Sequence, residues 1–155
     1  LTRKEKPMNL LEKIDTDLKS AMKNGDIVRT ETLKMLKSDI AYEKGKTGKD
    51  LTDEQLIEVV SRSAKRRRES IKEFQKGNRQ DLVDNETRQL AVVEEYLPQQ
   101  MTEEEIEKYI SDKIAALGTI TQKEIGKVMG ELMKELKGKA DGGAVKAILS
   151  KKISQ

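Results

Sequence analysis

Five lysines in the last third of the chain have the residue type and spacing that best fit a chemical role. They are Lys123, Lys127, Lys134, Lys137 and Lys139. On a helix the first three, at i, i+4 and i+11, fall roughly along one face, and the other two follow at the helix end. Such a row of ammonium groups can bind successive phosphates of a nucleic acid. A solvated helix face, with Lys127 paired to an acid four residues later, explains the same pattern, so both interpretations stay open.

A second basic cluster lies in the run Lys65-Arg-Arg-Arg68. Four consecutive helical side chains point in all directions, so the run as a whole is not one patch. Arg62 lies three residues before Lys65 and four before Arg66, and these three share one flank that could bind phosphate. Arg67 instead falls in line with apolar residues of the same segment. It needs a buried acidic partner or an opening to a ligand, and we expect the salt bridge.

Other polar patterns point away from catalysis. The segment Gly45-Lys-Thr-Gly48 lacks the full spacing and the preceding strand of a phosphate loop, so we expect a flexible turn. Glu103–Glu105 would diverge by about 100° per residue on a helix and suit its positive end rather than one metal ion. The chain has no Cys and no His, which excludes disulfides, thiolate nucleophiles, imidazole bases and Cys/His zinc sites. We therefore predict no catalytic residue, no metal site and no cofactor.

The elements that position these side chains are expected to be helices. Only 3% of the residues are aromatic and 38% are charged, strong helix formers are abundant, and no run of period two suggests a strand. Apolar residues recur at spacings of three and four in successive segments. We predict an all-α protein with seven helices at about 9–24, 26–44, 53–76, 79–97, 102–117 and 121–136, and from about 141 to the end.

Residues suited to helix ends agree with this periodicity. Thr52, Thr102 and Thr121 each precede Gln or Glu by three residues, which is the spacing of a capping box. Glycines follow four of the segments, at positions 25, 77, 118 and 138, where Gly138 closes the sixth helix. Asn9 is expected to cap the first helix, and Asp141 the last.

Two further glycines, Gly126 and Gly130, stand four residues apart inside the sixth helix. They predict close packing of a neighbouring helix. Direct contact between their backbone and RNA is the alternative. Both interpretations hold together if the packing shapes a surface that faces RNA.

A domain boundary is expected at Pro98, which cannot continue a helix and restricts the residue before it. Composition also changes there: residues 98–121 carry a net charge of −3, and residues 122–155 have eight lysines against four acids. We predict a four-helix N-terminal domain over residues 1–97 and a small three-helix C-terminal domain over residues 98–155. Residues 1–7 are a candidate leader. No apolar run approaches 18 residues, so we predict no membrane span and a cytoplasmic protein.

Several motifs resemble those of the GatB/YqeY family in its stand-alone, YqeY-like form. They are Glu95-Tyr-Leu-Pro98, Gly126-Lys-Val-Met-Gly130, Lys137-Gly-Lys-Ala-Asp141, Leu33-Lys-Met-Leu36 and Arg67-Arg-Glu-Ser70. The resemblance covers nearly all of residues 8–155. It implies two helical domains and kinship with the tail of the B subunit of the tRNA-dependent amidotransferase, which contacts tRNA.

The resemblance also implies a family label, carbon–nitrogen ligase with glutamine as amido-nitrogen donor. Nothing in this chain matches a glutaminase or kinase site, so we expect the label to be borrowed from the larger enzyme. Three functions follow. We favour a non-catalytic tRNA-binding module that uses the C-terminal lysines. A protein-interaction adaptor without an RNA role is the alternative, and an amidotransferase acting alone is the third.

Overall fold

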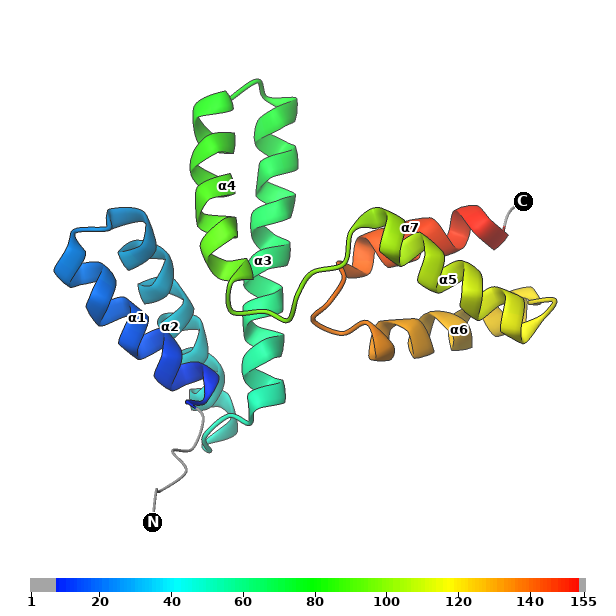
Figure 1. Cartoon of the computed structure of the whole chain (residues 1–155), viewed down its shortest axis with the longest axis horizontal. Coiled ribbons are helices and arrows are strands. Elements are labelled where there is room, and N and C mark those ends of the chain that lie inside the picture. The colour runs from blue at the N-terminus through cyan, green and yellow to red at the C-terminus, as the bar shows by residue number, and fades with distance from the viewer. Residues whose placement is uncertain (1–7, 154–155) are drawn as a thin grey trace, which may run out of the picture. The chain divides into compact units, whose positions relative to one another are not determined.

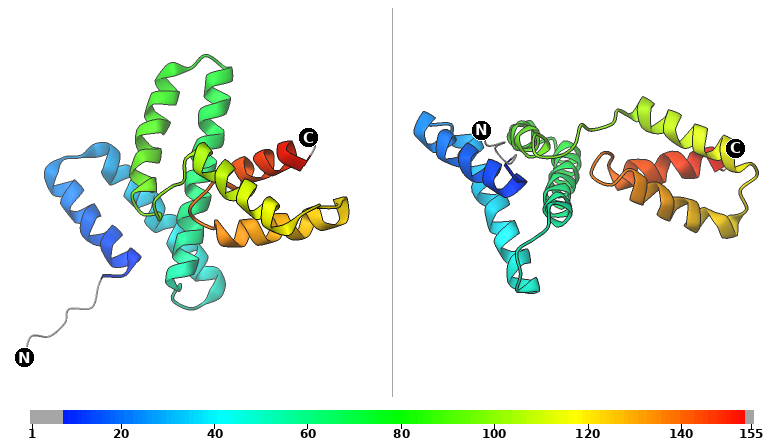
Figure 2. Two further views of the ribbon diagram at one scale, coloured as in Figure 1. Left: turned by 45° about the vertical axis from the view of Figure 1, so that its right-hand side comes forward. Right: turned by 60° about the horizontal axis from the view of Figure 1, so that its bottom comes forward.

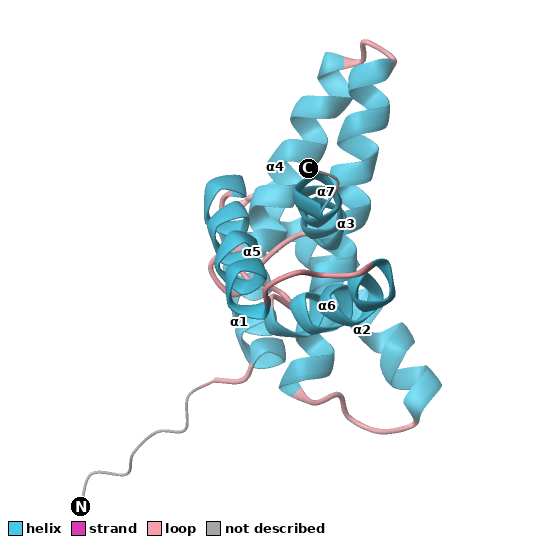
Figure 3. Cartoon of the chain, turned by 90° about the vertical axis from the view of Figure 1, so that its right-hand side faces the viewer, coloured by secondary structure: helices cyan, strands magenta, loops and turns pink. Residues whose placement is uncertain are grey.

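A computed structural model describes residues 8–153, which form seven α-helices and no strand (Figure 3). This confirms the all-α class. The helices are α1 (Leu10–Asn24), α2 (Ile27–Thr47), α3 (Asp53–Lys76), α4 (Gln80–Glu94), α5 (Glu103–Leu117), α6 (Gln122–Glu135) and α7 (Gly142–Ile153). The candidate leader, residues 1–7, lies outside the described residues.

Packing of the Cα atoms divides the chain into two compact units between Leu97 and Pro98. That the units are independently folding domains stays a prediction. In the N-terminal unit α1 and α2 form one antiparallel pair and α3 and α4 another (Figure 1). Their facing stripes bury one aliphatic core with a single aromatic ring: Ile14, Leu18, Leu33, Leu36, Ile40, Leu56, Val59, Val60, Ala64, Val92, Val93 and Tyr96.

The unequal lengths of α3 and α4 leave part of α3 without α4 beside it. At 1.5 Å per residue, the 24 residues of α3 span about 36 Å and the 15 residues of α4 about 22 Å. The N-terminal turns of α3 therefore extend past α4 (Figure 1). A hollow between α2 and α3 is lined by side chains from residues 39–46 of α2 and residues 59–69 in the middle of α3.

The first helix boundaries follow the predicted caps. Asn9 accepts a 2.8 Å hydrogen bond from the N–H of Glu12. Thr52 and Gln55 form the complete capping box, because each side chain accepts from the other's backbone N–H. Gly25 adopts a left-handed φ of 69°, which a residue with a Cβ adopts at a cost.

Two predicted boundaries are wrong. Helix α2 continues through Gly45 to Thr47, because a helical glycine costs only about 1 kcal/mol and the left-handed turn falls at Gly48, whose φ is 70°. Helix α4 ends at Glu94 rather than at residue 97. The N–H of Leu97 bonds three residues back to the carbonyl of Glu94, at 3.1 Å, in a tight turn that leads into Pro98.

Two of the three predicted capping boxes are incomplete. Thr102 accepts from the N–H of Glu105 at 3.2 Å, but its hydroxyl also donates to the Glu105 carboxylate. Thr121 accepts no N–H of its helix and donates to Glu124 at 3.1 Å. In both places the acidic side chain binds the hydroxyl rather than the backbone.

The C-terminal unit is a three-helix bundle in which α7 packs against both α5 and α6 (Figure 2). Its core is entirely aliphatic: Ile106, Ile110, Val128, Leu132, Leu136, Val145 and Leu149. Asp141 accepts from the N–H of Ala144 at 3.3 Å and so caps α7 as predicted. Within residues 8–153, no helix combines the length and apolar character needed to cross a bilayer.

Candidate nucleic-acid interface

Helix α6 separates apolar and basic residues onto opposite faces. Val128 and Leu132 are buried in the core. At about 100° per residue, Lys123, Lys127 and Lys134 fall on the far side, and all three are exposed. None of the three has an ion pair with a residue in the described part of the chain. We call these three residues the α6 lysine stripe.

Two acids of α6 are turned away from this stripe. Lys113 of α5 lies 3.3 Å from the carboxylate of Glu131 and 2.6 Å from that of Glu135. Tyr109 also donates to Glu135, at 2.6 Å. The hydrogen bond from Lys113, aided by that from Tyr109, lowers the pKa of the Glu135 carboxyl below its usual value. The pair of Lys127 with Glu131 that the alternative interpretation allowed is not formed, because Glu131 pairs with Lys113 of α5 instead.

The two remaining lysines extend from a loop held in one conformation. Gly138 has a left-handed φ of 76°, and its carbonyl accepts a 2.6 Å hydrogen bond from the side chain of Gln100. The carbonyl of Lys139 accepts from the N–H of Met101 at 2.8 Å. Lys137 and Lys139 are both exposed. Hydrogen bonds from the Gln100 side chain and the Met101 backbone thus hold this loop at the end of α6, where both lysines were predicted.

The predicted close packing at Gly126 and Gly130 is wrong within this unit. A Cβ built on either glycine meets no atom within 4 Å, and both lie on the exposed side of α6. The close approach occurs instead at Gly142, where a Cβ would lie 2.6 Å from the Cε atom of Met133. The glycines of α6 leave bare backbone beside the lysine stripe.

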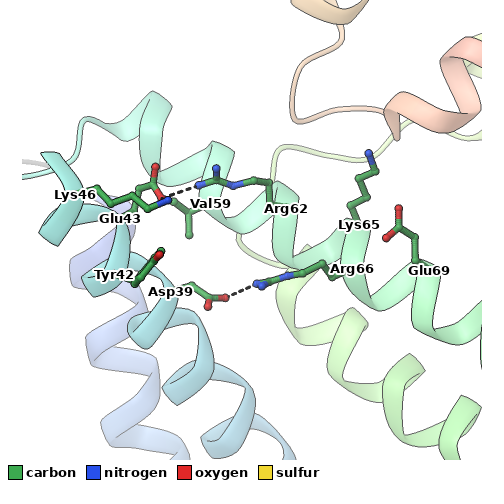
Figure 4. Close-up of a pocket in the computed structure, with 9 residues that line it drawn as sticks. All are labelled: Asp39, Tyr42, Glu43, Lys46, Val59, Arg62, Lys65, Arg66 and Glu69. Atoms are coloured by element: carbon green, nitrogen blue, oxygen red, sulfur yellow. Dashed lines mark hydrogen bonds and ion pairs between the residues drawn. The ribbon is translucent and has the colours of Figure 1, made fainter.

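The N-terminal basic flank is largely paired. Arg62 lies 3.2 Å from Glu43, and Arg66 lies 2.7 Å from Asp39. These arginines on α3 reach across to acids on α2, while Lys65 has no ion pair among the described residues (Figure 4). The side chains border a hollow of about 460 Å³, which we call the α2–α3 groove. Two of the three cations of this flank are thus paired with carboxylates of α2.

Arg67 has the acidic partner expected of it, Glu86, whose side chain is partly buried. Arg67 is only 6% exposed, and its guanidinium donates to Glu86 at 3.1 Å and to the side chain of Gln89. Met35 contributes a sulfur contact at 3.6 Å. The structural salt bridge is confirmed.

The Glu95-Tyr-Leu-Pro98 motif attaches the end of α4 to the first helix pair. Arg29 of α2 binds Glu95 through two hydrogen bonds of 2.5 and 3.1 Å, which lower the pKa of the Glu95 carboxyl. Tyr96 is buried and donates to Asp17 of α1 at 2.6 Å. Burial is the main cause, and this hydrogen bond the second, that raises the pKa of the Tyr96 phenol well above its usual value. The motif therefore stabilises the fold beside the boundary at Pro98.

The acids at the start of α5 do not converge. Glu103, Glu104 and Glu105 are exposed in the first turn, where the helix dipole favours negative charge. Among residues 8–153, no group of three or more Asp and Glu side chains has the arrangement to hold a metal ion.

Comparison with known proteins identifies the family. The profile of the YqeY-like proteins matches residues 11–153, which is nearly the whole chain. The chain belongs to the YqeY-like family. The motif-based resemblance is thereby confirmed.

Three relatives of the YqeY-like chain are fungal proteins. It is 31% identical over 134 residues to "Altered inheritance of mitochondria protein 41, mitochondrial" of Pyrenophora tritici-repentis, covering 84% of this chain and 73% of the relative. It is 36% identical over 104 residues to the protein of that name from Lachancea thermotolerans, covering 65% and 56%. An uncharacterized protein of Schizosaccharomyces pombe is 30% identical over 91 residues, covering 59% and 74%. Two relatives are thus named as mitochondrial, and a cytoplasmic location for this chain stays a prediction.

Two contributions to the candidate interface were not visible in the sequence. Lys113 removes two carboxylates from the basic face of α6, and Gln100 holds the loop that carries Lys139. Both residues act on partners in a different segment of the chain. Only the periodicity of α5 hinted that Lys113 lies near its buried side, since it follows Ile110 by three residues.

Proposed function

We propose that this YqeY-like chain is a non-catalytic binding protein for structured RNA, most specifically tRNA. The contacts come from the C-terminal three helices of a protein built as a four-helix domain followed by a three-helix domain. The carrying observation is the separation of charge on α6. The stripe of Lys123, Lys127 and Lys134 is exposed and has no ion pair among residues 8–153, while Glu131 and Glu135 bind Lys113. Neutralised phosphates release counterions, which favours binding.

The chemistry of this surface suits a folded RNA better than a single strand. Lysine binds phosphate as a point charge, and a phosphate contact carries no information about the base sequence. The exposed backbone at Gly126 and Gly130 lets a sugar–phosphate ridge approach the helix closely. Tyr109 is the aromatic side chain on α5 in this unit, and its hydroxyl is bound to Glu135. Recognition by shape and phosphate spacing is the mode expected for helical RNA.

The test is a filter-binding titration of the full chain with tRNA at several salt concentrations. The double variant Lys127→Gln, Lys134→Gln should bind more weakly at low salt. The slope of log affinity against log salt should fall by about 0.7–0.9 for each phosphate that the variant no longer neutralises. The matched control is Lys108→Gln, Lys146→Gln, which removes the same charge from exposed lysines of α5 and α7.

Two outcomes oppose the proposal. Wild-type protein that fails to bind tRNA at low salt has no such function, and equal losses in both double variants show that net charge, not the α6 stripe, causes binding. In the first case the adaptor hypothesis takes its place, and partners captured after nuclease treatment would support it.

A further inference from the structure

The α2–α3 groove has a composition that salt bridges alone do not explain. Its volume of about 460 Å³ lies in the range of small-molecule sites. Its lining includes two arginines held by carboxylates, a lysine without an ion pair to any described residue, and an exposed aromatic ring; Lys46, Val59 and Glu69 complete it (Figure 4). All of them lie within the N-terminal unit, whereas the α6 lysine stripe belongs to the C-terminal unit.

The two arginines are oriented but not saturated. Arg62 and Arg66 each meet their carboxylate through the Nη2 atom, and their side chains are 58% and 64% exposed. A guanidinium has five N–H donors, so each arginine keeps most of them for another acceptor. Because Glu43 and Asp39 already restrict the side chains, binding a second anion costs little further rotamer entropy.

Tyr42 provides a different kind of contact. It lies on α2 between the acids that hold the two arginines, and it is 68% exposed (Figure 4). The Nζ atom of Lys46 lies 4.7 Å from the centre of its ring. An exposed ring beside guanidinium groups is the pairing used to stack a base while its phosphate is bound.

We propose that the α2–α3 groove binds one nucleotide, with the phosphate on Arg62 and Arg66 and the base stacked on Tyr42. Lys65 adds charge at the rim. Since Asp39 and Glu43 offset the two arginines, the affinity depends on directed N–H donors more than on net charge. Binding here should therefore depend less on salt than binding along α6. The site does not rest on the proposed function, and either can fail alone.

This nucleotide has two sources, a free mononucleotide or an unpaired nucleotide of an RNA. The experiment titrates the full chain by calorimetry with adenosine monophosphate, with a short single-stranded oligoadenylate and with inorganic phosphate. Binding of the mononucleotide identifies a free ligand, and binding of the oligonucleotide alone identifies an RNA strand. Whichever nucleotide probe binds should do so at least about fivefold more tightly than inorganic phosphate, because only a nucleotide can stack its base.

Variants connect binding to the groove. The double variant Arg62→Gln, Arg66→Gln should lower the affinity for the nucleotide that binds by about tenfold or more. Tyr42→Leu should lower it by about fivefold or more. The matched control is Arg79→Gln, which removes another exposed arginine that lies 3.0 Å from a carboxylate, that of Asp81. Lys127→Gln, Lys134→Gln should leave mononucleotide binding unchanged, which separates this site from the α6 stripe.

Three results overturn the proposal. They are failure of both nucleotide probes to bind the wild-type chain, affinities that the groove variants leave unchanged, and equal losses in Arg79→Gln. Circular dichroism of each variant keeps the test valid, because the substituted residues of the groove and its control are more than half exposed, Lys127 and Lys134 are exposed too, and their removal should leave the helices intact.

Discussion

Arg67 and Glu95 show how single charged residues serve the fold of the N-terminal unit. Arg67 lies among apolar residues, where an unpaired charge is costly, and it is bound by Glu86 and Gln89. Glu95 lies nearer the surface, and its partner Arg29 holds the chain just before Pro98. The two pairs differ in burial, so their loss should differ in cost.

Removal of Glu86 should destabilise the protein because Arg67 stays buried with fewer acceptors. We expect Glu86→Ala to lower the free energy of unfolding by about 2 kcal/mol, measured by urea denaturation. The double variant Arg67→Met, Glu86→Ala should recover part of this loss, since no buried charge remains. A double variant less stable than Glu86→Ala would contradict this account.

The Arg29–Glu95 pair should make stability depend on pH. The pKa of Glu95 lies below its usual 4.5 in the folded state, so the stabilisation is present above that pH and disappears as pH falls through the folded-state value. Both side chains are partly exposed, at 31% and 49%, so Glu95→Gln should cost only about 1 kcal/mol at pH 7. Denaturation curves of the variant and the wild type should converge as the pH falls below the lowered, folded-state pKa of Glu95. A difference that does not shrink at all as the solution is acidified would exclude this cause.

At the scale of elements, α6 is the helix whose two sides have separate roles. Its apolar side holds the three-helix bundle together through Val128 and Leu132. Its outer side carries lysines and two glycines with open space around them. Glycine in an exposed helix interior lowers stability relative to alanine, so this side was not selected for stability alone.

Gly130→Ala should therefore separate stability from binding. The new methyl group meets no atom within 4 Å, so the free energy of unfolding should rise by up to about 1 kcal/mol. If RNA approaches this backbone closely, the same substitution should lower tRNA affinity. Thermal melts and filter binding on one preparation measure both effects. A more stable variant with wild-type affinity would remove the glycines, but not the lysines, from the proposed interface.

At the scale of the whole molecule, the described residues form two hydrophobic cores, and no buried residue belongs to both. The N-terminal core is the larger, and the C-terminal one is formed by seven aliphatic side chains at the centre of 58 residues. A core of this size gives limited stability. The units should therefore unfold separately.

A fragment of residues 98–155 should fold alone into helices with a free energy of unfolding below about 5 kcal/mol. Circular dichroism during urea denaturation measures this, and the full chain should show two transitions. If the α6 stripe is the RNA site, the fragment should retain most of the affinity for tRNA, whereas residues 1–97 should not. A single transition for the full chain, coincident with that of neither fragment, would mean that the units depend on each other.

Local signals in the sequence determined the helices and most of their ends. Caps and left-handed glycines act within four residues, so Asn9, Thr52 and Gly25 could be interpreted without knowing the fold. Apolar periodicity likewise placed Arg67 on an inner face. The predicted end of α2 was wrong because Gly45 and Gly48 are both glycines, and the sequence does not show which of them adopts the left-handed conformation that ends the helix.

Tertiary structure alone decided which charges are available. The sequence showed the lysines of α6 and a spacing that could match successive phosphates. It also showed the alternative, pairing of these lysines with acids on the same helix. The choice depended on Lys113, which comes from α5 and binds Glu131 and Glu135 because the bundle brings the two helices together. In the same way, Arg62 and Arg66 border a groove rather than an open flank, because the tertiary fold places acids of α2 opposite them. Periodicity gives the face of a helix, but which side chain neutralises a charge depends on residues far away in the chain.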